Sequence, residues 1–333
     1  MNNTVLVTGA DGFIGSHLVE KLVSSGINVR AFCMYNSRGS WGWLDTLPTE
    51  LKDNLDVVLG DIRDPLCVKN SMTGCSQVFH LAALIGIPYS YVAPSSYIDT
   101  NIHGTLNVVQ SARDLGIERV IHTSTSEAYG SAQFVPITEA HPLVGQSPYA
   151  ATKIAADQIA LSYWRSFETP VTVLRPFNTY GPRQSSRAVI PTIISQIASG
   201  KKKLELGDLS PTRDFNFVED TCSAFIAVSK TNKAIGKVIN AASNFEVSIA
   251  NTVKYISEIM NKDIEIALDK NRIRPKLSEV NRLFGDNSLL KEITDWQPMF
   301  EGIEGFKRGL KITADWFKNP DNIAFYRADR YSV

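Results

Sequence analysis

Short apolar segments of strand length recur along the first half of this chain, and segments with helical periodicity separate them. Continuous apolar runs are typical of strands that are covered on both faces, as in a parallel sheet with helices on each side. The pattern therefore predicts an α/β fold with a doubly wound parallel sheet. Its predicted strands are Thr4–Thr8, Asn28–Met34, Asp56–Leu59, Gln77–Leu81, Arg119–Thr123 and Val171–Arg175.

The regular pattern ends after Arg175, where Pro176, Gly181-Pro182 and Pro191 interrupt it and more polar segments follow. We therefore expect a main domain over residues 1–180 and a smaller lobe over residues 181–333. Lys237–Ala241 again looks like a strand. It predicts that a segment near residues 215–245 returns to the main sheet, so that the two parts are interleaved.

Composition excludes several classes of partner. Lys plus Arg equals Asp plus Glu, at 34 residues each, so no overall field attracts nucleic acid or an anionic membrane. No apolar stretch approaches the length of a membrane span. The segment Met1–Thr4 runs directly into the first strand without a basic region and a long apolar stretch, so we expect no secretory signal.

Cysteine and histidine spacing bears on compartment and metal binding. The four cysteines are scattered and form no Cys-x-x-Cys pair, which suits a reducing cytoplasm. The five histidines are dispersed and form no His-Glu-x-x-His helix. We therefore expect a cytoplasmic protein without a metal site.

Three glycines, Gly9, Gly12 and Gly15, follow the first predicted strand directly and open a helix that begins near Phe13 and Ile14. In this context one glycine permits a sharp turn, one lets the backbone approach a pyrophosphate, and one lets helix and strand pack closely. The helix N-terminus then faces the phosphates. A Rossmann-type site for NAD or NADP is predicted, in preference to a tight turn that binds nothing.

The second predicted strand leaves the choice between the two cofactors open. An NAD site usually ends this strand with a carboxylate for the adenosine ribose, but here Cys33 and its neighbours stand in that place. Arg30 or Arg38 would suit the 2′-phosphate of NADP, although either is equally well explained as a surface arginine. Asn36 lies in the same loop and is a further candidate contact.

Two more strand ends carry candidate cofactor contacts. Asp61 and Ile62 follow the third strand, where a carboxylate can accept a hydrogen bond from the adenine amino group. Asp61 has an equal claim to be a loop acid or a helix cap. Leu81, Ala82 and Ala83 end the fourth strand and are placed near the nicotinamide half of the cofactor.

The fifth strand ends in a run rich in hydroxyl groups, Thr123-Ser124-Thr125-Ser126, followed by Glu127. Ligands of a doubly wound sheet bind at this carboxyl edge. Ser147 and Pro148 then predict a helix start, with Ser147 as the N-cap.

On that predicted helix, Tyr149 and Lys153 share one face. A lysine ammonium near a phenol favours the phenolate, so we expect a lowered pKa for Tyr149 and proton abstraction from an alcohol near neutral pH. Thr125 is placed to steer the same alcohol. Taken alone, the Tyr-x-x-x-Lys pair is more simply an ordinary amphipathic helix, but it gains weight beside the glycine loop and the hydroxyl run.

These motifs resemble the extended short-chain dehydrogenase/reductase family, and the resemblance covers nearly the whole chain. It includes Asn101-Ile102-His103-Gly104-Thr105, Arg175–Pro182 and Arg213-Asp214-Phe215. It implies a nucleoside-diphosphate sugar as substrate and a tightly bound, recycled NAD or NADP. Further cofactor contacts are implied for Asn101, Thr123, Tyr149, Lys153, Pro176 and Asn178, and substrate contacts for Thr125, Asn178, Arg213 and Arg274. Arg274 is equally well explained as a surface residue.

Within the family, Thr125-Ser126-Glu127 resembles the motif of sugar-nucleotide 4,6-dehydratases of the GDP-mannose type, and also that of some UDP-glucuronate decarboxylases. A dehydratase must remove a proton from C5 once C4 is a ketone, and Glu127 is the candidate base. Other dehydratases have an Asp-Glu pair, whereas here Ser126 stands in the first place. An epimerase, a decarboxylase, a net oxidoreductase, or a non-catalytic sensor of cofactor ratio remain as alternatives.

Two segments narrow the resemblance further. Tyr35-Asn36-Ser37 with Trp41-Gly42-Trp43, and Ile85–Tyr91, are similar to the subgroup that forms a 4-keto-6-deoxy-N-acetylglucosamine for legionaminic acid. The resemblance favours GDP- or UDP-N-acetylglucosamine as substrate. The two tryptophans are better explained as loop anchors than as ligand contacts. The family resemblance also implies a homodimer through the helix after Tyr149 and the helix near Gly104–Leu115.

Overall fold

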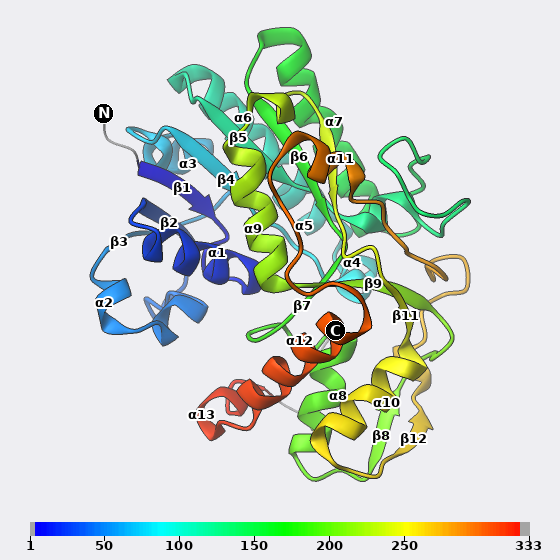
Figure 1. Cartoon of the computed structure of the whole chain (residues 1–333). Coiled ribbons are helices and arrows are strands. Elements are labelled where there is room, and N and C mark those ends of the chain that lie inside the picture. Colours follow the sequence, from blue (N-terminus) through cyan, green and yellow to red (C-terminus); the bar gives the residue numbers. More distant parts are fainter. Residues whose placement is uncertain (1–3, 327–333) are drawn as a thin grey trace.

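The computed structural model describes residues 4–326, and Met1–Asn3 and residues 327–333 lie outside the described part. Within residues 4–326, seven parallel strands form the central sheet in the order β10-β6-β5-β4-β1-β2-β3 (Figure 1). The strands are β1 Thr4–Thr8, β2 Asn28–Met34, β3 Leu55–Gly60, β4 Gln77–His80, β5 Arg119–Thr123, β6 Val171–Pro176 and β10 Val238–Ala241. The predicted doubly wound Rossmann-type sheet is confirmed, and each predicted strand lies within one or two residues of an observed one.

Helices cover both faces of this sheet. α1 (Phe13–Ser24) and α9 (Val218–Ser229) pack together on one face, and α3 (Pro65–Met72), α6 (Gly104–Leu115) and α7 (Pro148–Phe167) pack side by side on the other (Figure 1). Alternate residues of one strand therefore enter different cores. In β1, for example, Val5 and Val7 join the core under α1, whereas Leu6 joins the core under α6.

The strand predicted at Lys237–Ala241 forms as β10 and pairs with β6, so a late segment of the chain completes the sheet. The remaining strands form two small sheets, of order β11-β9-β7 and β12-β8. These strands are β7 Asn178–Tyr180, β8 Lys203–Leu206, β9 Thr212–Phe217, β11 Glu246–Ser248 and β12 Glu265–Leu268. A division of the chain into two domains near residue 180 remains a proposal.

The small sheets lie with helices of the C-terminal half in the lower part of Figure 1. These helices are α8 Val189–Ala198, α10 Ile249–Met260, α12 Gly302–Phe317 and α13 Pro320–Ile323, whereas α11 Ser288–Ile293 lies higher in the view, next to β10 of the main sheet. The remaining short helices are α2 Thr49–Lys52, α4 Ile87–Val92 and α5 Pro94–Tyr97. Among the helices of residues 4–326, none combines the length and apolar character needed to cross a bilayer.

The order of the strands determines where a ligand can bind. The sheet extends in one direction from β1 through β2 to β3, and in the other from β4 through β5 to β6. The crevice outside the carboxyl ends of β1 and β4 is the switch point at which such sheets bind ligands. The glycine loop after β1 and the hydroxyl run after β5 both lie at this edge.

Candidate active site

The three glycines of the loop after β1 meet different steric demands. Gly9 has a φ of +68°, and a Cβ at this position would lie 2.8 Å from the backbone nitrogen of Ala82. A Cβ on Gly15 would lie 2.1 Å from the carbonyl oxygen of Gly9. Gly12 is exposed, and its nearest neighbour would be 3.3 Å away. Gly9 and Gly15 therefore allow close packing, and Gly12 leaves backbone accessible to a ligand.

The start of α1 fits a dinucleotide phosphate. Phe13 and Ile14 form its first turn, and Gly12 stands at the N-cap, where no side chain accepts a hydrogen bond from the helix. Free amide groups at a helix N-terminus favour an anion. This geometry fits the pyrophosphate of NAD or NADP, as the glycine spacing predicts.

Asn36 and Arg30, the residues near the end of β2 that were predicted to contact the cofactor, form hydrogen bonds within the protein. The Asn36 side chain binds the backbone of its own loop: Oδ1 accepts from Arg38 and Ser40, and Nδ2 donates to Met34 and Ser40. Asn36 therefore shapes the loop, and the prediction that it contacts the cofactor is not supported by its hydrogen bonding. Arg30 pairs with Asp56 over 2.6 Å and also donates to two carbonyl groups, so its candidacy for a 2′-phosphate is wrong. Arg38 is exposed.

The two contacts predicted after β3 differ in burial. Asp61 forms a bidentate ion pair with Arg63, with an Nη2–Oδ2 distance of 2.5 Å. This hydrogen bonding lowers the pKa of Asp61 and keeps its carboxyl group ionised. Ile62 is buried and packs beneath Gly104. An ionised Asp61 still accepts hydrogen bonds, so its role toward adenine remains a prediction.

The segment after β4 is tied to the catalytic helix by Asn101. Leu81, Ala82 and Ala83 are partly buried beside the glycine loop. Asn101 lies in a π-helical turn over Ile98–His103, where its Nδ2 donates to the carbonyl oxygen of Leu84 and to the hydroxyl group of Thr152 on α7. Both of its amide hydrogens are used within the protein, so Asn101 helps to position α7, and its contact with the cofactor remains a prediction.

The hydroxyl run after β5 folds into a short 3₁₀ turn over Ser126–Tyr129. Thr125 caps this turn, because its Oγ1 accepts a hydrogen bond from the amide of Glu127 over 3.2 Å. Ser126 and Glu127 are both buried, at 2% and 8% exposure. The structure therefore gives Glu127 a buried position at the sheet edge.

Tyr149 stands at the start of α7, where Ser147 accepts a hydrogen bond from the amide of Ala150 and Pro148 occupies the first helical position. Its phenol hydrogen-bonds with Thr125 and lies close enough to Glu127 for that negative charge to act on it. The structure thus brings Thr125, Glu127 and Tyr149 together, as the sequence predicts.

The predicted lowering of the Tyr149 pKa is wrong for this structure. Burial raises the pKa of Tyr149 because desolvation disfavours the phenolate, and the charge of Glu127 adds to this effect. Lys153 is itself buried, which lowers its pKa to about 8, and its Nζ donates to the carbonyl oxygen of Thr123 over 2.5 Å. Its ammonium therefore binds the end of β5.

A buried ionic network around Asp157 lies beneath Tyr149 and Lys153, and the sequence did not predict it. Asp157 is fully buried one turn beyond Lys153 on α7 and accepts hydrogen bonds from Ser124 over 2.7 Å and from Arg175 over 2.8 Å. His122 of β5 lies 3.2 Å from its other oxygen. These partners hold the pKa of Asp157 below its usual range despite burial. Its spacing of four residues from Lys153 was the only available signal.

The candidate substrate residues lie on separate segments that converge near Glu127. Arg213 of β9 pairs with Glu279 over 3.0 Å, and the charge of Glu127 also acts on its guanidinium. Arg274 lies 4.0 Å from the same Glu279, and its Nη1 is buried without a hydrogen-bond partner. Buried atoms of this kind fit an added anion such as a diphosphate.

Two further predicted residues follow from β6. Pro176 ends that strand and is buried, whereas Asn178 of β7 is partly buried, and its Oδ1 is buried without a partner. An amide oxygen in this position fits a hydroxyl or amide donor of a ligand. The individual contacts assigned to both residues remain predictions.

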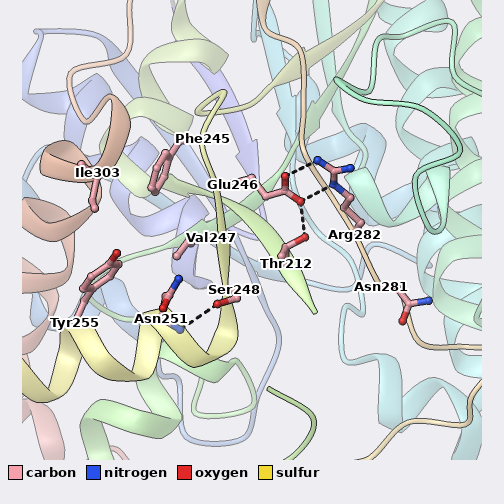
Figure 2. Close-up of a pocket in the computed structure, with 10 residues that line it drawn as sticks. All are labelled: Thr212, Phe245, Glu246, Val247, Ser248, Asn251, Tyr255, Asn281, Arg282 and Ile303. Atoms are coloured by element: carbon pink, nitrogen blue, oxygen red, sulfur yellow. Dashed lines mark hydrogen bonds and ion pairs between the residues drawn. The ribbon is translucent and has the colours of Figure 1, made fainter. Parts of the chain in front are cut away.

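A separate open hollow of about 610 Å³ lies on the C-terminal part, beside β11 and α10. Figure 2 shows Glu246 paired with Arg282 at its centre, with an Oε1–Nε distance of 2.7 Å. Neither Glu127, Tyr149 nor Lys153 lines this hollow, so we place the candidate active site at the sheet edge and not here. Within residues 4–326, no group of three or more His, Cys, Asp or Glu side chains is arranged to hold a metal ion.

Comparison with known proteins identifies the family of this chain. The sequence profile of the GDP-mannose 4,6 dehydratase family matches residues 6–308. The chain belongs to this family. It is 29% identical to the human (Homo sapiens) dTDP-D-glucose 4,6-dehydratase, over 94% of this chain and 89% of that protein. It is 31% identical to the UDP-N-acetyl-alpha-D-glucosaminuronate decarboxylase of Bacillus cytotoxicus, over 97% of this chain and 100% of that protein.

A similar solved structure is the UDP-glucuronic acid 4-epimerase of Bacillus cereus in complex with UDP-glucuronic acid and NAD, with a TM-score of 0.84 and 26% identity. The similarity covers 95% of this chain and 99% of that chain. The proteins similar to this chain thus include a dehydratase, a decarboxylase and an epimerase. The comparisons support the predicted cofactor and the nucleotide-sugar chemistry, and leave the individual reaction to the residues of the site.

Proposed function

We propose that this protein is an NAD(P)-dependent nucleotide-sugar 4,6-dehydratase that converts a nucleoside-diphosphate hexose to its 4-keto-6-deoxy form. The observation that carries the proposal is the buried carboxyl group of Glu127 at the carboxyl edge of the sheet, whose negative charge acts on the Tyr149 phenol. Removal of the C5 proton requires a base beside the group that handles the C4 hydroxyl. An epimerase has no need of a carboxylate there.

Proton transfers in the proposed reaction belong to three side chains. Tyr149 takes the proton of the C4 hydroxyl group while Thr125 holds that hydroxyl by a hydrogen bond. Bound in its oxidised form, the nicotinamide would bring positive charge to the phenol, accept hydride from C4 and later return it at C6. Glu127 removes the proton from C5 of the resulting ketone and protonates the departing C6 hydroxyl group, so that water leaves. C5 then takes up one proton from solvent as hydride returns to C6, which balances the proton that Tyr149 took from the C4 hydroxyl group and released.

Substrate binding in this proposal uses the cations that converge near Glu127. Arg213 and Arg274 share Glu279, and the buried Nη1 of Arg274 has no hydrogen-bond partner, so these guanidinium groups are suited to bind a diphosphate. Asn178 contributes its unpartnered Oδ1. The resemblance noted in the loops after β2 and β4 favours GDP- or UDP-N-acetylglucosamine as the sugar nucleotide.

A decarboxylase is the second candidate, and Arg213 supports it. The guanidinium of Arg213 lies close enough to Glu127 for the two charges to interact, and it would also suit the carboxylate of a uronic acid. The Bacillus cytotoxicus relative has such an activity in its name. We rank decarboxylation second because that reaction requires no base to remove a proton from C5.

Incubation with a panel of nucleotide sugars, without added cofactor, separates these reactions. We expect the product mass to fall by one water for a UDP- or GDP-hexose, with no net redox change. Loss of carbon dioxide from a UDP-uronic acid would establish the decarboxylase, and an isomer of unchanged mass would establish an epimerase.

We also propose that the protein forms a homodimer through α6 and α7. These helices pack against each other, with Tyr163 donating to Gln110 over 2.6 Å, and expose Leu106 and Phe167. Sedimentation at micromolar concentration is expected to give a dimer that Leu106→Glu converts to a monomer. A wild-type monomer would contradict this part of the proposal.

A further inference from the structure

The end of β2 lacks the acidic residue that usually binds the adenosine ribose of NAD. Cys33 is fully buried in that place, and burial together with nearby acids raises the pKa of its thiol to about 12, so it stays neutral. Met34 and Tyr35 follow with exposed apolar side chains. The strand itself therefore offers no anionic acceptor for a ribose hydroxyl group.

A carboxylate reaches this position from the glycine loop instead. Asp11 lies between Gly9 and Gly12, and its Oδ2 accepts a hydrogen bond from the amide of Met34 over 3.4 Å. The negative charge of Asp11 also acts on Cys33. These contacts place the Asp11 carboxyl group at the carboxyl end of β2, beside the backbone that binds the pyrophosphate.

The loop after β2 holds Asp11 in place. The amide of Trp43 donates to the carbonyl oxygen of Asp11 over 3.1 Å. Gly42 has a φ of +60°, and a Cβ there would lie 2.6 Å from the same oxygen. Trp43 is anchored in turn against Trp316 and Phe325, with ring centroids 5.7 and 5.0 Å away. The position of Asp11 is therefore fixed by packing on both sides.

The charges around this position disfavour a phosphate. Asp45 also acts on Cys33 and accepts hydrogen bonds from Ser40 and from the amide of Trp41, so two carboxylates face the end of β2. The guanidinium of Arg30 is held by Asp56, and Arg38 is exposed. A 2′-phosphate would meet like charge here, whereas a ribose diol would meet an acceptor.

We propose that Asp11 accepts hydrogen bonds from the 2′- and 3′-hydroxyl groups of the adenosine ribose and thereby makes the protein select NAD over NADP. Within residues 4–326, the Asp11 carboxyl group accepts hydrogen bonds from two main-chain amides, those of Met34 and of Asp11 itself. Its oxygens thus retain lone pairs for two hydroxyl donors. Asp11 replaces, from the glycine loop, the acid that β2 lacks.

Competition between the two cofactors tests this proposal. Purified protein is incubated with an equimolar excess of NAD and NADP, desalted, and the bound nucleotides are released and quantified. Wild type should retain NAD over NADP by at least about tenfold, because charge-assisted hydrogen bonds to two hydroxyl groups are at stake. Equal retention, or a preference for NADP, would overturn the proposal without any variant.

Variants then assign the preference to Asp11. Asp11→Asn should lower the ratio of bound NAD to bound NADP by at least about tenfold, whereas the matched surface change Asp53→Asn should leave it unchanged. Arg38→Ala should also leave it unchanged, since this side chain takes no part. An unaltered ratio in Asp11→Asn, confirmed as folded by its circular dichroism, or a shift in Arg38→Ala alone, would contradict the proposal. Neither result bears on the sugar chemistry, because Asp11 lies at the adenosine end of the site.

Discussion

Lys153 donates a hydrogen bond from its Nζ to the main-chain carbonyl oxygen of Thr123 over 2.5 Å. The bond joins α7 to the end of β5, where the hydroxyl run begins. Because Lys153 is buried, its pKa is lowered to about 8, and its ammonium still predominates at neutral pH. The lysine thus supplies both a fixed position and a positive charge beneath the catalytic residues.

Lys153→Met should lower turnover at pH 7 by at least about 100-fold, because both the bond to Thr123 and the nearby charge are lost. The remaining activity should also lose the part of the pH dependence that comes from Lys153 itself, whose pKa lies at about 8. Turnover measured between pH 6 and 9.5 provides the check. A pH profile that matches wild type would remove Lys153 from the account.

Asp157→Asn should lower the free energy of unfolding by about 3–5 kcal/mol, because it leaves Arg175 buried without an ionic partner. Glu258→Gln, which removes an exposed partner of Lys254 on α10, should cost less than about 1 kcal/mol. Urea denaturation of both variants measures the difference. Equal losses would show that the buried network adds no more than a surface pair.

Gly15→Ala and Gly12→Ala should separate stability from cofactor binding. A Cβ on Gly15 collides with the Gly9 carbonyl group, so Gly15→Ala should unfold at a lower temperature and retain little cofactor. A Cβ on Gly12 would lie 3.3 Å from the same oxygen, which is much milder crowding, so Gly12→Ala should lose far less of its melting temperature than Gly15→Ala when cofactor is absent, yet bind the dinucleotide more weakly. Equal melting temperatures for the two variants would contradict the steric argument.

His17→Gln should make the protein less sensitive to acid. Burial and the nearby Arg183 lower the pKa of His17 to about 4, against about 6.5 in an unfolded chain. The unfolded state therefore binds more protons between these values, and stability is lost as the pH falls from 6.5 toward 4. Glutamine can still donate to the carbonyl oxygen of Pro182, which His17 Nε2 approaches at 3.0 Å. Urea denaturation at pH 7 and pH 5 should show a smaller loss for the variant, and an equal loss would refute this assignment.

The elements that the sequence predicts well depend on short stretches of chain. Each strand of the sheet is a continuous apolar run, and the start of α7 is coded by the adjacent Ser147 and Pro148. The glycine loop is equally local. The interpretation of Trp43 as a loop anchor is confirmed by its packing against Trp316.

The features that the sequence could not predict depend on contacts between distant segments. The network of Asp157 joins β5, β6 and α7. The raised pKa of Tyr149 follows from burial, which spacing on a helix does not reveal. The hydrogen-bond partners of Asn36 and Arg30 come from the folded loop and from β3. The sequence alone therefore did not show that these two side chains are already engaged within the protein. Asp11 reaches the end of β2 only once β1 and β2 are paired.

The most direct test of the proposed dehydratase uses Glu127→Gln and absorbance in the near ultraviolet. Glutamine keeps the size of the side chain but cannot remove the C5 proton, so the variant should oxidise C4, accumulate reduced cofactor with the bound ketone, and release little 6-deoxy product. Tyr149→Phe is the matched control and should accumulate no reduced cofactor, because it stops the reaction one step earlier. If Glu127→Gln turns over at the wild-type rate without lasting absorbance of reduced cofactor, elimination through Glu127 is wrong. The protein should then be assigned as an epimerase or a simple dehydrogenase.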